Sequence, residues 1–595
     1  MTGVDIVKAV SRFGGVRSVI VFSGVTIAAL AALLAMRGRK RKHSDLSEAK
    51  SNSSDSASDQ DGASTTAGTS SSSNGESSDS SDGHHQADDV EDIVVAGDDS
   101  STGDSLFVRW SRRAGLVQPH SARRRKEARL SGAADVDDTA AAAAAAGAAS
   151  PGVPGTQRVY VKTFGCSHNT SDAEFMMGQL SSYGYHLVDS PQEADVCVIN
   201  SCTVKGPSQE AFMTAVQRAK AMGRPVVVSG CVPQADRTIP GLEDVSVIGI
   251  TQIDRVVEVV EQTLQGHIVR LLGKKSLPSL DLPKVRRNPH VEIIPLSTGC
   301  LGSCSYCKTK HARGKLGSYE TEAILDRVRR AISEGVMEIW LTSEDTGAYG
   351  IDLATDIAAL LRAVVGVLEA HPGSAGRVMV RLGMTNPPYM LRHCGSVGEV
   401  LRHPQVYEFI HVPIQSGSND TLRHMVREYT VEDFHALVDG LKQRVPRLTV
   451  ATDIICGFPT ETDDDHQQTL DVIRRHKFPV LNISQFYPRP GTAAAKLKRL
   501  PNHVAKTRSG EVTSVFESYE TTSWLQDTVQ RVWFCEHSTR SQHTVGHTKQ
   551  YVKVLVRRDE QLLGKSAFVR VTSTHKWHVL GEICQPPMDV EKGEP

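Results

Sequence analysis

The sequence predicts an α/β protein with three folded domains: an open parallel α/β domain at residues 157–273, a partial (βα)6 barrel at 290–520, and a small β-barrel at 521–587. Three hydrophobic segments of the first domain each end at a cysteine, which is typical of parallel strands with a site at their carboxyl ends. Six strand-like segments of the second domain alternate with helix-length segments, the pattern of parallel βα units. Short β-rich runs separated by glycines predict the terminal barrel.

The composition limits the possible classes of protein. The chain of 595 residues is long enough for several buried cores. Its formal net charge is −1, so a nucleic-acid site would have to be a local feature. Its eleven cysteines are sparse for this length and several cluster at ligand spacing, which favours a reducing compartment over a disulfide framework.

The N-terminal quarter differs in composition from the rest. After a tail at 1–17, residues 18–36 carry no charge and would span about 28 Å as a helix, close to the roughly 30 Å core of a membrane. The basic run RGRKRK that follows favours a cytosolic location for the C-terminal side. We therefore expect a transmembrane anchor at the endoplasmic reticulum with the folded domains in the cytosol. A cleaved signal peptide and an organellar location are the alternatives.

The remaining connecting segments are polar. Residues 37–156 are rich in Ser, Asp, Gly and Ala and are expected to form a disordered linker, because they cannot bury enough apolar surface to fold. A second linker at 274–289 joins the first two domains, and 588–595 form a C-terminal tail.

The strand-end cysteines of the first domain are Cys166, Cys202 and Cys231. The carboxyl ends of parallel strands meet at one edge of a sheet, so these thiols are expected to converge although they are far apart in the sequence. Three buried core thiols are the alternative. Cys197 lies within a strand among apolar residues and is expected in the core.

A second set of cysteines lies in a short loop after the first strand of the central domain. Cys300, Cys304 and Cys307 have the spacing CxxxCxxC. Thiolates select zinc, copper(I) or iron–sulfur centres, and a closed structural zinc site has four ligands. Three thiols in one loop therefore favour a four-iron cluster with one open iron. A Cys3His zinc site that includes His311 is the alternative.

This loop resembles the signature of radical S-adenosylmethionine (SAM) enzymes. Together with the segment that follows it and the three cysteine blocks of the first domain, it is similar to the threonylcarbamoyladenosine tRNA methylthiotransferases of eukaryotes and archaea. The resemblance extends from about residue 158 to about residue 581. It implies two 4Fe–4S clusters, one on each cysteine set, SAM as a cofactor, and a C-terminal TRAM module that binds tRNA.

The resemblance also implies a reaction. A 5′-deoxyadenosyl radical from SAM would remove hydrogen from C2 of N6-threonylcarbamoyladenosine at position 37 of ANN-decoding tRNAs, the first cluster would supply sulfur, and a second SAM would supply the methyl group. A flavoprotein or a ferredoxin would donate electrons. The alternatives are methylthiolation of N6-isopentenyladenosine, a non-catalytic membrane-tethered RNA-binding iron–sulfur protein, and a two-zinc binding module.

Polar residues at strand ends of the central domain are candidate SAM contacts. The candidates are Glu344, Gln415 and Asp453, with Tyr306 as a possible partner for the adenine. Ordinary loop and packing roles are the alternatives for each of them.

Cationic residues are candidate contacts to the substrate. Lys308, Lys310 and Arg313 follow the second cysteine set and could pair with the carboxylate of the threonylcarbamoyl group. Cationic and aromatic residues of the terminal barrel are expected to contact phosphates and bases, with a solvated surface as the alternative. They are Lys549, Lys553, Arg557, Arg558, Lys565 and Arg570, with Tyr551 and Phe568.

Overall fold

The computed structural model describes residues 156–204 and 206–587. The predicted membrane segment at 18–36, the linker up to residue 155 and the tail at 588–595 lie outside the described residues. Within the described part of the chain, no helix is both long enough and apolar enough to cross a membrane. The prediction of a membrane-anchored protein at the endoplasmic reticulum is corrected accordingly.

The first domain is a six-stranded parallel sheet of order β2-β1-β3-β4-β5-β6. Its strands are β1 (Arg158–Thr163), β2 (His186–Val188), β3 (Val196–Ser201), β4 (Val226–Gly230), β5 (Ser246–Ile248) and β6 (Arg270–Leu271). Its main helices are α4 (Ser167–Tyr183), α5 (Gly206–Ala221), α6 (Cys231–Ala235) and α7 (Val256–Leu264). Every residue of β3 and β4 is buried, as expected for central strands that are covered on both faces.

The segment after β6 joins the first domain to the central domain through buried charges. The side chain of Lys284 is 1% exposed, and its Nζ lies 3.2 Å from Glu174 Oε2 on α4 and 2.9 Å from Glu292 Oε1. Arg327 Nη2 lies 2.9 Å from Glu292 Oε2. Buried charges of this kind need partners, so the network holds the linker against both domains.

The central domain has the six predicted parallel strands in two three-stranded sheets, β11-β10-β7 and β12-β13-β14. An isolated parallel β-bridge between Val380 and Val406 lies between the two sheets. The strands are β7 (Val291–Pro295), β10 (Glu338–Thr342), β11 (Met379–Leu382), β12 (Phe409–His411), β13 (Thr449–Cys456) and β14 (Val480–Gln485). The arrangement confirms the six predicted parallel strands and their alternation with helices.

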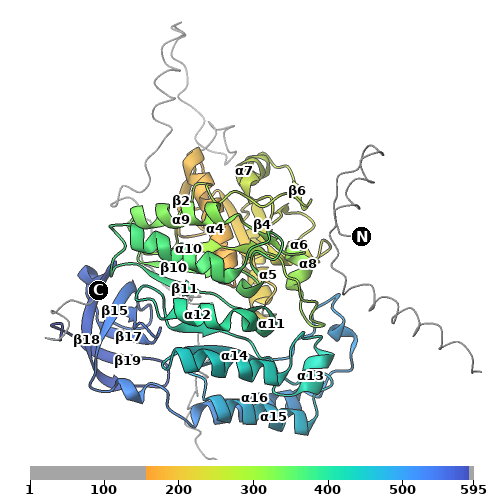
Figure 1. The fold of residues 1–595 in the computed structure, drawn as a ribbon. Helices are drawn as coiled ribbons and strands as arrows, with labels where there is room; N and C mark the ends of the chain where they lie inside the picture. The colour runs from red at the N-terminus through yellow and green to blue at the C-terminus, as the bar shows by residue number, and fades with distance from the viewer. Residues whose placement is uncertain (1–155, 205, 588–595) are drawn as a thin grey trace, which may run out of the picture. The chain divides into compact units, whose positions relative to one another are not determined.

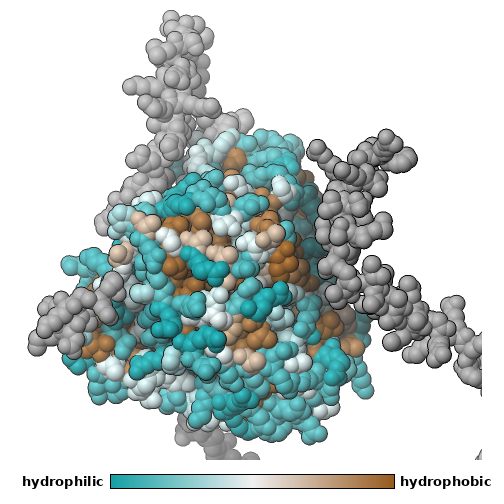
Figure 2. All heavy atoms as spheres, viewed as in Figure 1, coloured by the Kyte–Doolittle hydropathy of each residue, from teal (hydrophilic) through white to brown (hydrophobic). Residues whose placement is uncertain are grey.

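Helices accompany these strands (Figure 1). They are α8 (Thr309–Arg313), α9 (Thr321–Ser333), α10 (Ile357–Ala370), α11 (Pro387–Met390), α12 (Cys394–Leu401), α13 (Asn419–His424), α14 (Val431–Arg444), α15 (Asp463–His476) and α16 (Asn502–Glu517). Capping boxes begin α14 at Thr430 and Asp433 and α15 at Thr462 and Asp465. Figure 2 shows a mainly hydrophilic surface where α15 and α16 lie, so these helices turn their polar faces to solvent.

The C-terminal domain is a closed five-stranded barrel of order β15-β16-β17-β19-β18. Its strands are β15 (Val529–His537), β16 (His543–His547), β17 (Lys553–Arg557), β18 (Lys565–Thr574) and β19 (Val579–Cys584). The sequence predicts four of them, as β-rich runs at 531–535, 551–556, 566–571 and 577–583, and misses β16, which has the sequence HTVGH. Two histidines and a glycine in five residues conceal its alternation.

This barrel packs against the central domain through an aromatic cluster. Trp533 and Tyr551 join Trp340 and Tyr407 in one buried core. The guanidinium of Arg381 lies 4.1 Å from the centre of the Trp340 ring and donates a hydrogen bond of 3.2 Å to the hydroxyl of Tyr551. The domains therefore share a continuous core.

Two predicted RNA contacts belong to this interface instead. Tyr551 is 6% exposed and stacks on His547 with ring centres 4.2 Å apart. Lys549 donates a hydrogen bond of 2.8 Å to the carbonyl of Leu401, and burial lowers the pKa of its ammonium to about 8. Their predicted contact with bases or phosphates is wrong, because packing against the central domain buries Tyr551 and directs Lys549 to backbone carbonyls of that domain.

Candidate functional site

The three cysteines of the first domain converge at the carboxyl edge of its sheet. Cys166 follows β1, Cys202 follows β3, and Cys231 begins α6 directly after β4. Cys202 and Cys231 are buried, and Cys166 is half-buried. A hydrogen bond with Cys202, burial and the nearby Cys231 hold the pKa of the Cys166 thiol well above its ordinary value. We refer to these three residues as the first triad.

Backbone geometry brings two of these thiols together. Gly165 has φ +94°, in the region that favours glycine. A Cβ atom at this position would lie 2.0 Å from Cys202 Cβ and 2.5 Å from Cys202 Sγ. Only glycine allows the end of β1 to approach the end of β3 this closely.

Cys300, Cys304 and Cys307 form the second triad, in the loop after the short strand β8 (Ser297–Thr298). All three are half-buried. Burial raises the pKa of Cys300 to about 12, and Asp345, Cys304 and Cys307 add to this effect. A segment far away in the sequence fixes the loop, because Ser305 donates its N–H to the carbonyl of Met425 at 2.9 Å.

The donor chemistry of both triads suits iron–sulfur clusters, since thiolates are the usual ligands of such clusters. In the described part of the chain, no group of three or more His, Cys, Asp or Glu side chains is arranged to hold a single metal ion. His311, the fourth ligand of the alternative zinc site, is exposed on α8.

Arg427 is a neighbour of the second triad that the sequence analysis misses. Its Nη1 lies 3.0 Å from Cys304 Sγ, its Nε donates to the hydroxyl of Tyr429 at 3.0 Å, and its Nη2 donates to Asn386 Oδ1. Arg427 is 123 residues from Cys304 in the sequence, so no local motif could reveal the contact. Its guanidinium places a positive charge beside the cysteine loop.

Of two adjacent carboxylates after β10, Asp345 faces the second triad and Glu344 does not. Asp345 accepts hydrogen bonds from the N–H and the Nδ2 of Asn386 at 3.1 and 2.8 Å, and burial raises its pKa to about 6. Glu344 lies 3.0 Å from His168 Nδ1 and 3.1 Å from Arg313 Nε. Glu344 thus points to the first domain.

The other three predicted SAM contacts are Tyr306, Gln415 and Asp453. Tyr306 is buried and packs edge-on against Phe458, with ring centres 6.4 Å apart. Gln415 has φ +70°, and its backbone N–H donates a hydrogen bond of 2.8 Å to the carbonyl of Asp453. The carboxylate of Asp453 accepts a hydrogen bond of 2.8 Å from Asn482 Nδ2 and is 2.9 Å from His411 Nε2. Tyr306 therefore has a packing role in this structure, and Asp453 belongs to a polar group within the barrel.

The three cations predicted to bind substrate have separate environments. Lys310 donates to the carbonyls of Leu301 and Gly302, both at 2.7 Å, and to Ser303 Oγ at 2.9 Å. These contacts use its three N–H groups and brace the cysteine loop. Lys308 donates to the carbonyl of Pro490 at 2.6 Å and keeps two N–H groups for other acceptors.

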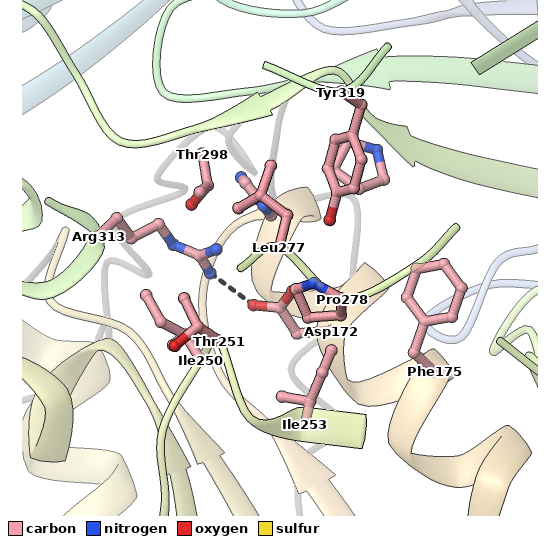
Figure 3. Close-up of a pocket in the computed structure, with 12 residues that line it drawn as sticks. Asp172, Phe175, Ile250, Thr251, Ile253, Leu277, Pro278, Thr298, Arg313 and Tyr319 are labelled. Atoms are coloured by element: carbon pink, nitrogen blue, oxygen red, sulfur yellow. Dashed lines mark hydrogen bonds and ion pairs between the residues drawn. The ribbon is translucent and has the colours of Figure 1, made fainter. Parts of the chain in front are cut away.

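Arg313 is buried between the first and central domains. Figure 3 shows its guanidinium directed at the carboxylate of Asp172, at a distance of 2.6 Å. Burial opposes its charge, but Asp172, Cys231 and Glu344 hold its pKa well above the ordinary value. Arg313 is therefore engaged by protein carboxylates and lies beside the first triad.

A small cavity adjoins this ion pair (Figure 3). Its lining includes Thr251 and Thr298, and their buried hydroxyl oxygens have no hydrogen-bond partner among the described residues. Buried hydroxyls of this kind are usually satisfied by ordered water.

Two arginines connect the surroundings of the two triads. Arg313 follows the second triad by six residues and lies beside Cys166 and Cys231. Arg489 lies within electrostatic reach of Cys307 of the second triad and Cys202 of the first. Arg489 therefore lies near one cysteine of each triad.

Known proteins resemble this chain over its folded domains. The description "Uncharacterized protein family UPF0004" matches residues 158–246, and "Radical SAM superfamily" matches 294–473. A threonylcarbamoyladenosine tRNA methylthiotransferase of Xenopus laevis is 46% identical, covering 84% of this chain and 86% of the relative. The protein of the same name from Homo sapiens is 45% identical, covering 83% of each chain.

A solved structure is also similar to part of this chain. A radical SAM methyltransferase from Kitasatospora setae, with cobalamin and a 4Fe–4S cluster bound, matches with a TM-score of 0.43 at 15% identity. The match covers 57% of this chain and 74% of that chain. Similarity at this level carries no argument about function.

Proposed function

The chain belongs to the threonylcarbamoyladenosine tRNA methylthiotransferases, and we propose that it methylthiolates N6-threonylcarbamoyladenosine at position 37 of tRNA. The observation that carries the proposal is the pair of cysteine triads, one in each of the two family regions of the chain. Each triad supplies three thiols, one fewer than the number of irons in a 4Fe–4S cluster.

The cofactors follow from the same arrangement. The radical SAM region includes Cys300, Cys304 and Cys307, and it accounts for SAM and for one 4Fe–4S cluster at the second triad. We propose a second 4Fe–4S cluster at the first triad, supported by the convergence of three strand-end thiols. When bound, these groups supply reductive cleavage of SAM, removal of hydrogen from C2 of the base, and the sulfur and methyl that replace it.

The protein orients these groups. We assign Asp345 to the ammonium of SAM and Arg427 to its carboxylate, because both face the second triad and carry the complementary charges. Asn386 contacts both side chains and holds them in place. In this assignment Asp345 replaces Glu344, whose carboxylate pairs with the first domain.

The C-terminal barrel remains the proposed tRNA-binding module, with a smaller contact set. Arg557, Lys565 and Arg570 are exposed, and Lys553 is partly exposed. These four cations are available to phosphates, unlike Lys549. A flavoprotein or a ferredoxin is the proposed electron donor.

The experiment that tests the function is mass spectrometry of nucleosides from bulk tRNA, with and without the protein in its host. Loss of 2-methylthio-N6-threonylcarbamoyladenosine and accumulation of its precursor are the expected result. Loss of the isopentenyl analogue would contradict the substrate assignment. No change in either nucleoside would contradict the enzymatic function.

The second cluster has its own test. Anaerobically purified protein should contain about eight iron atoms per chain, and replacement of either triad by alanine should leave about four. The variant that lacks Cys166, Cys202 and Cys231 should still cleave SAM without forming the methylthio product. Unchanged iron in that variant would contradict the second cluster.

A further inference from the structure

The loop that follows β14 is docked onto the second triad. Ala494 donates its N–H to the carbonyl of Ser305 at 2.8 Å, and Lys308 Nζ donates to the carbonyl of Pro490 at 2.6 Å. Thr492 donates its N–H and its hydroxyl to the carbonyl of Arg489, at 3.1 and 2.7 Å. The backbone of Arg489 is therefore fixed beside the cysteine loop.

The guanidinium of Arg489 differs from those of its cationic neighbours. It is partly buried, and within the described residues no hydrogen bond or ion pair of this group is found. Burial lowers its pKa, while Cys307 and Cys202 act in the opposite direction. By contrast, the side chains of Arg313, Arg427 and Lys310 all have protein partners.

A partly buried cation without a partner is costly, and an anionic ligand removes that cost. Lys308 supplies a second cation at the same place, since its Nζ contacts the carbonyl next to Arg489 and would lie 3.2 Å from a Cβ at Gly491. A guanidinium and an ammonium that both reach one carboxylate form a suitable site for it.

Exposed apolar side chains flank both triads. Val204 is 45% exposed, Leu301 36%, Val426 48% and Tyr487 47%. Each lies within two residues of a triad cysteine, of Arg427 or of Arg489. Exposed aromatic and apolar groups around a concentration of cations are suited to an unstacked base, because aromatic rings stack on it.

We propose that Arg489, assisted by Lys308, binds the carboxylate of the threonylcarbamoyl group and so selects the modified adenosine. This inference rests on the proposed function. In the proposed reaction C2 would lose hydrogen near the second triad and gain sulfur near the first, so the base would lie between the two triads. Arg489 is a cation within electrostatic reach of both. SAM also carries a carboxylate, but Arg427 is available to that group on the side of Cys304.

The test compares RNAs that differ by one charge. The protein, with its clusters reconstituted anaerobically, is titrated with an anticodon stem–loop that carries threonylcarbamoyladenosine and with the same RNA carrying the neutral threonine methylamide. Wild-type protein should bind the acid roughly tenfold more tightly than the amide. Arg489→Gln should abolish this preference and leave the affinity for the amide unchanged, whereas Arg489→Lys should keep part of it.

Lys498→Ala is the matched control, since Lys498 is an exposed cation of the same segment and should leave the preference intact. Equal binding of acid and amide by the wild type would overturn the inference, even if Arg489→Gln failed to fold. A preference that survives in Arg489→Gln would also overturn it. An Arg489 variant that keeps the preference but needs more SAM for cleavage would also overturn the inference, because Arg489 would then bind SAM.

Failure of the proposed function is recognised separately. Wild-type protein would then form no methylthio product from the acid RNA, although the binding comparison would still show whether Arg489 reads the carboxylate.

Discussion

At the scale of single residues, Glu344 and Asp345 show how neighbouring carboxylates acquire different tasks. Glu344 is enclosed by His168 and Arg313 at the border with the first domain, and Asp345 faces the cysteine loop. The sequence indicates that a carboxylate at this strand end matters. It does not show which one, because the turn after β10 decides the direction of each side chain.

This pair yields a prediction about SAM. Asp345→Asn should raise the Kd for SAM roughly tenfold, because it removes a charge-assisted contact with the ammonium. Glu344→Gln is the adjacent control and should leave the Kd for SAM within about twofold. Equilibrium binding to anaerobically reconstituted protein measures both. The opposite ranking of the two variants would return the SAM contact to Glu344.

At the scale of elements, the end of β1 controls the first triad. Gly165→Ala places a Cβ within 2.5 Å of Cys202 Sγ, so Cys202 must move. We expect this variant to lose about half of its iron and all methylthiolation while it still cleaves SAM, because only the first triad is disturbed.

The control for Gly165→Ala is Gly223→Ala. Gly223 also has a positive φ, of +66°, but a Cβ there meets nothing within 4 Å. This control carries the backbone strain of about 1 kcal/mol without the steric clash. Iron content distinguishes the variants, and full iron in Gly165→Ala would show that the triad tolerates the displacement.

The regular elements were largely predictable, and the contacts between them were not. All six strands of the central domain are predicted, because buried strands and amphipathic helices alternate clearly in the sequence. The convergence of Cys166, Cys202 and Cys231 is also predicted, since strand ends share an edge. Arg427 and Asn386 were missed because their role arises only when distant segments meet at the second triad.

Tyr551 shows the reverse error. An aromatic residue among cations on a small barrel is typical of RNA-binding surfaces, but here it fills a core shared with the central domain. Sequence alone does not show which face of a barrel another domain will cover.

At the scale of the whole molecule, Glu338 couples the C-terminal barrel to the central domain. It accepts hydrogen bonds from Trp340 Nε1 at 2.8 Å and the hydroxyl of Tyr407 at 2.6 Å, and His547 Nδ1 lies 3.5 Å away. Burial opposes its charge, but His547, Tyr407 and Trp340 lower its pKa to about 2.

A lowered pKa in the folded state makes stability depend on pH. The stabilisation from Glu338 is complete above its unfolded pKa of about 4.3 and is lost as the pH falls toward 2. Glu338→Gln should therefore be less stable than wild type by about 3 kcal/mol at pH 7, and the difference should shrink below about pH 5. Denaturant unfolding across this range measures it. A constant difference would contradict the assignment of the charge.

The buried network at Lys284 couples the first two domains in a similar way. Lys284→Met leaves Glu174 without its cation and should lower the free energy of unfolding by about 3 kcal/mol. Lys275→Met, in the same linker, removes a pair with Asp254 in which Lys275 is 45% exposed, and should cost less than about 1 kcal/mol. Urea unfolding compares the two. Equal losses would show that the buried network has no special role.

The shared core of Trp533, Tyr551, Trp340 and Tyr407 also matters during synthesis. The central domain is translated first, and its apolar end stays uncovered until the last domain emerges from the ribosome. At typical elongation rates this interval is on the order of ten seconds. A newly made chain thus carries an aromatic surface, open to chaperones and to aggregation, for a period set by translation speed, and early termination before residue 521 makes that exposure permanent.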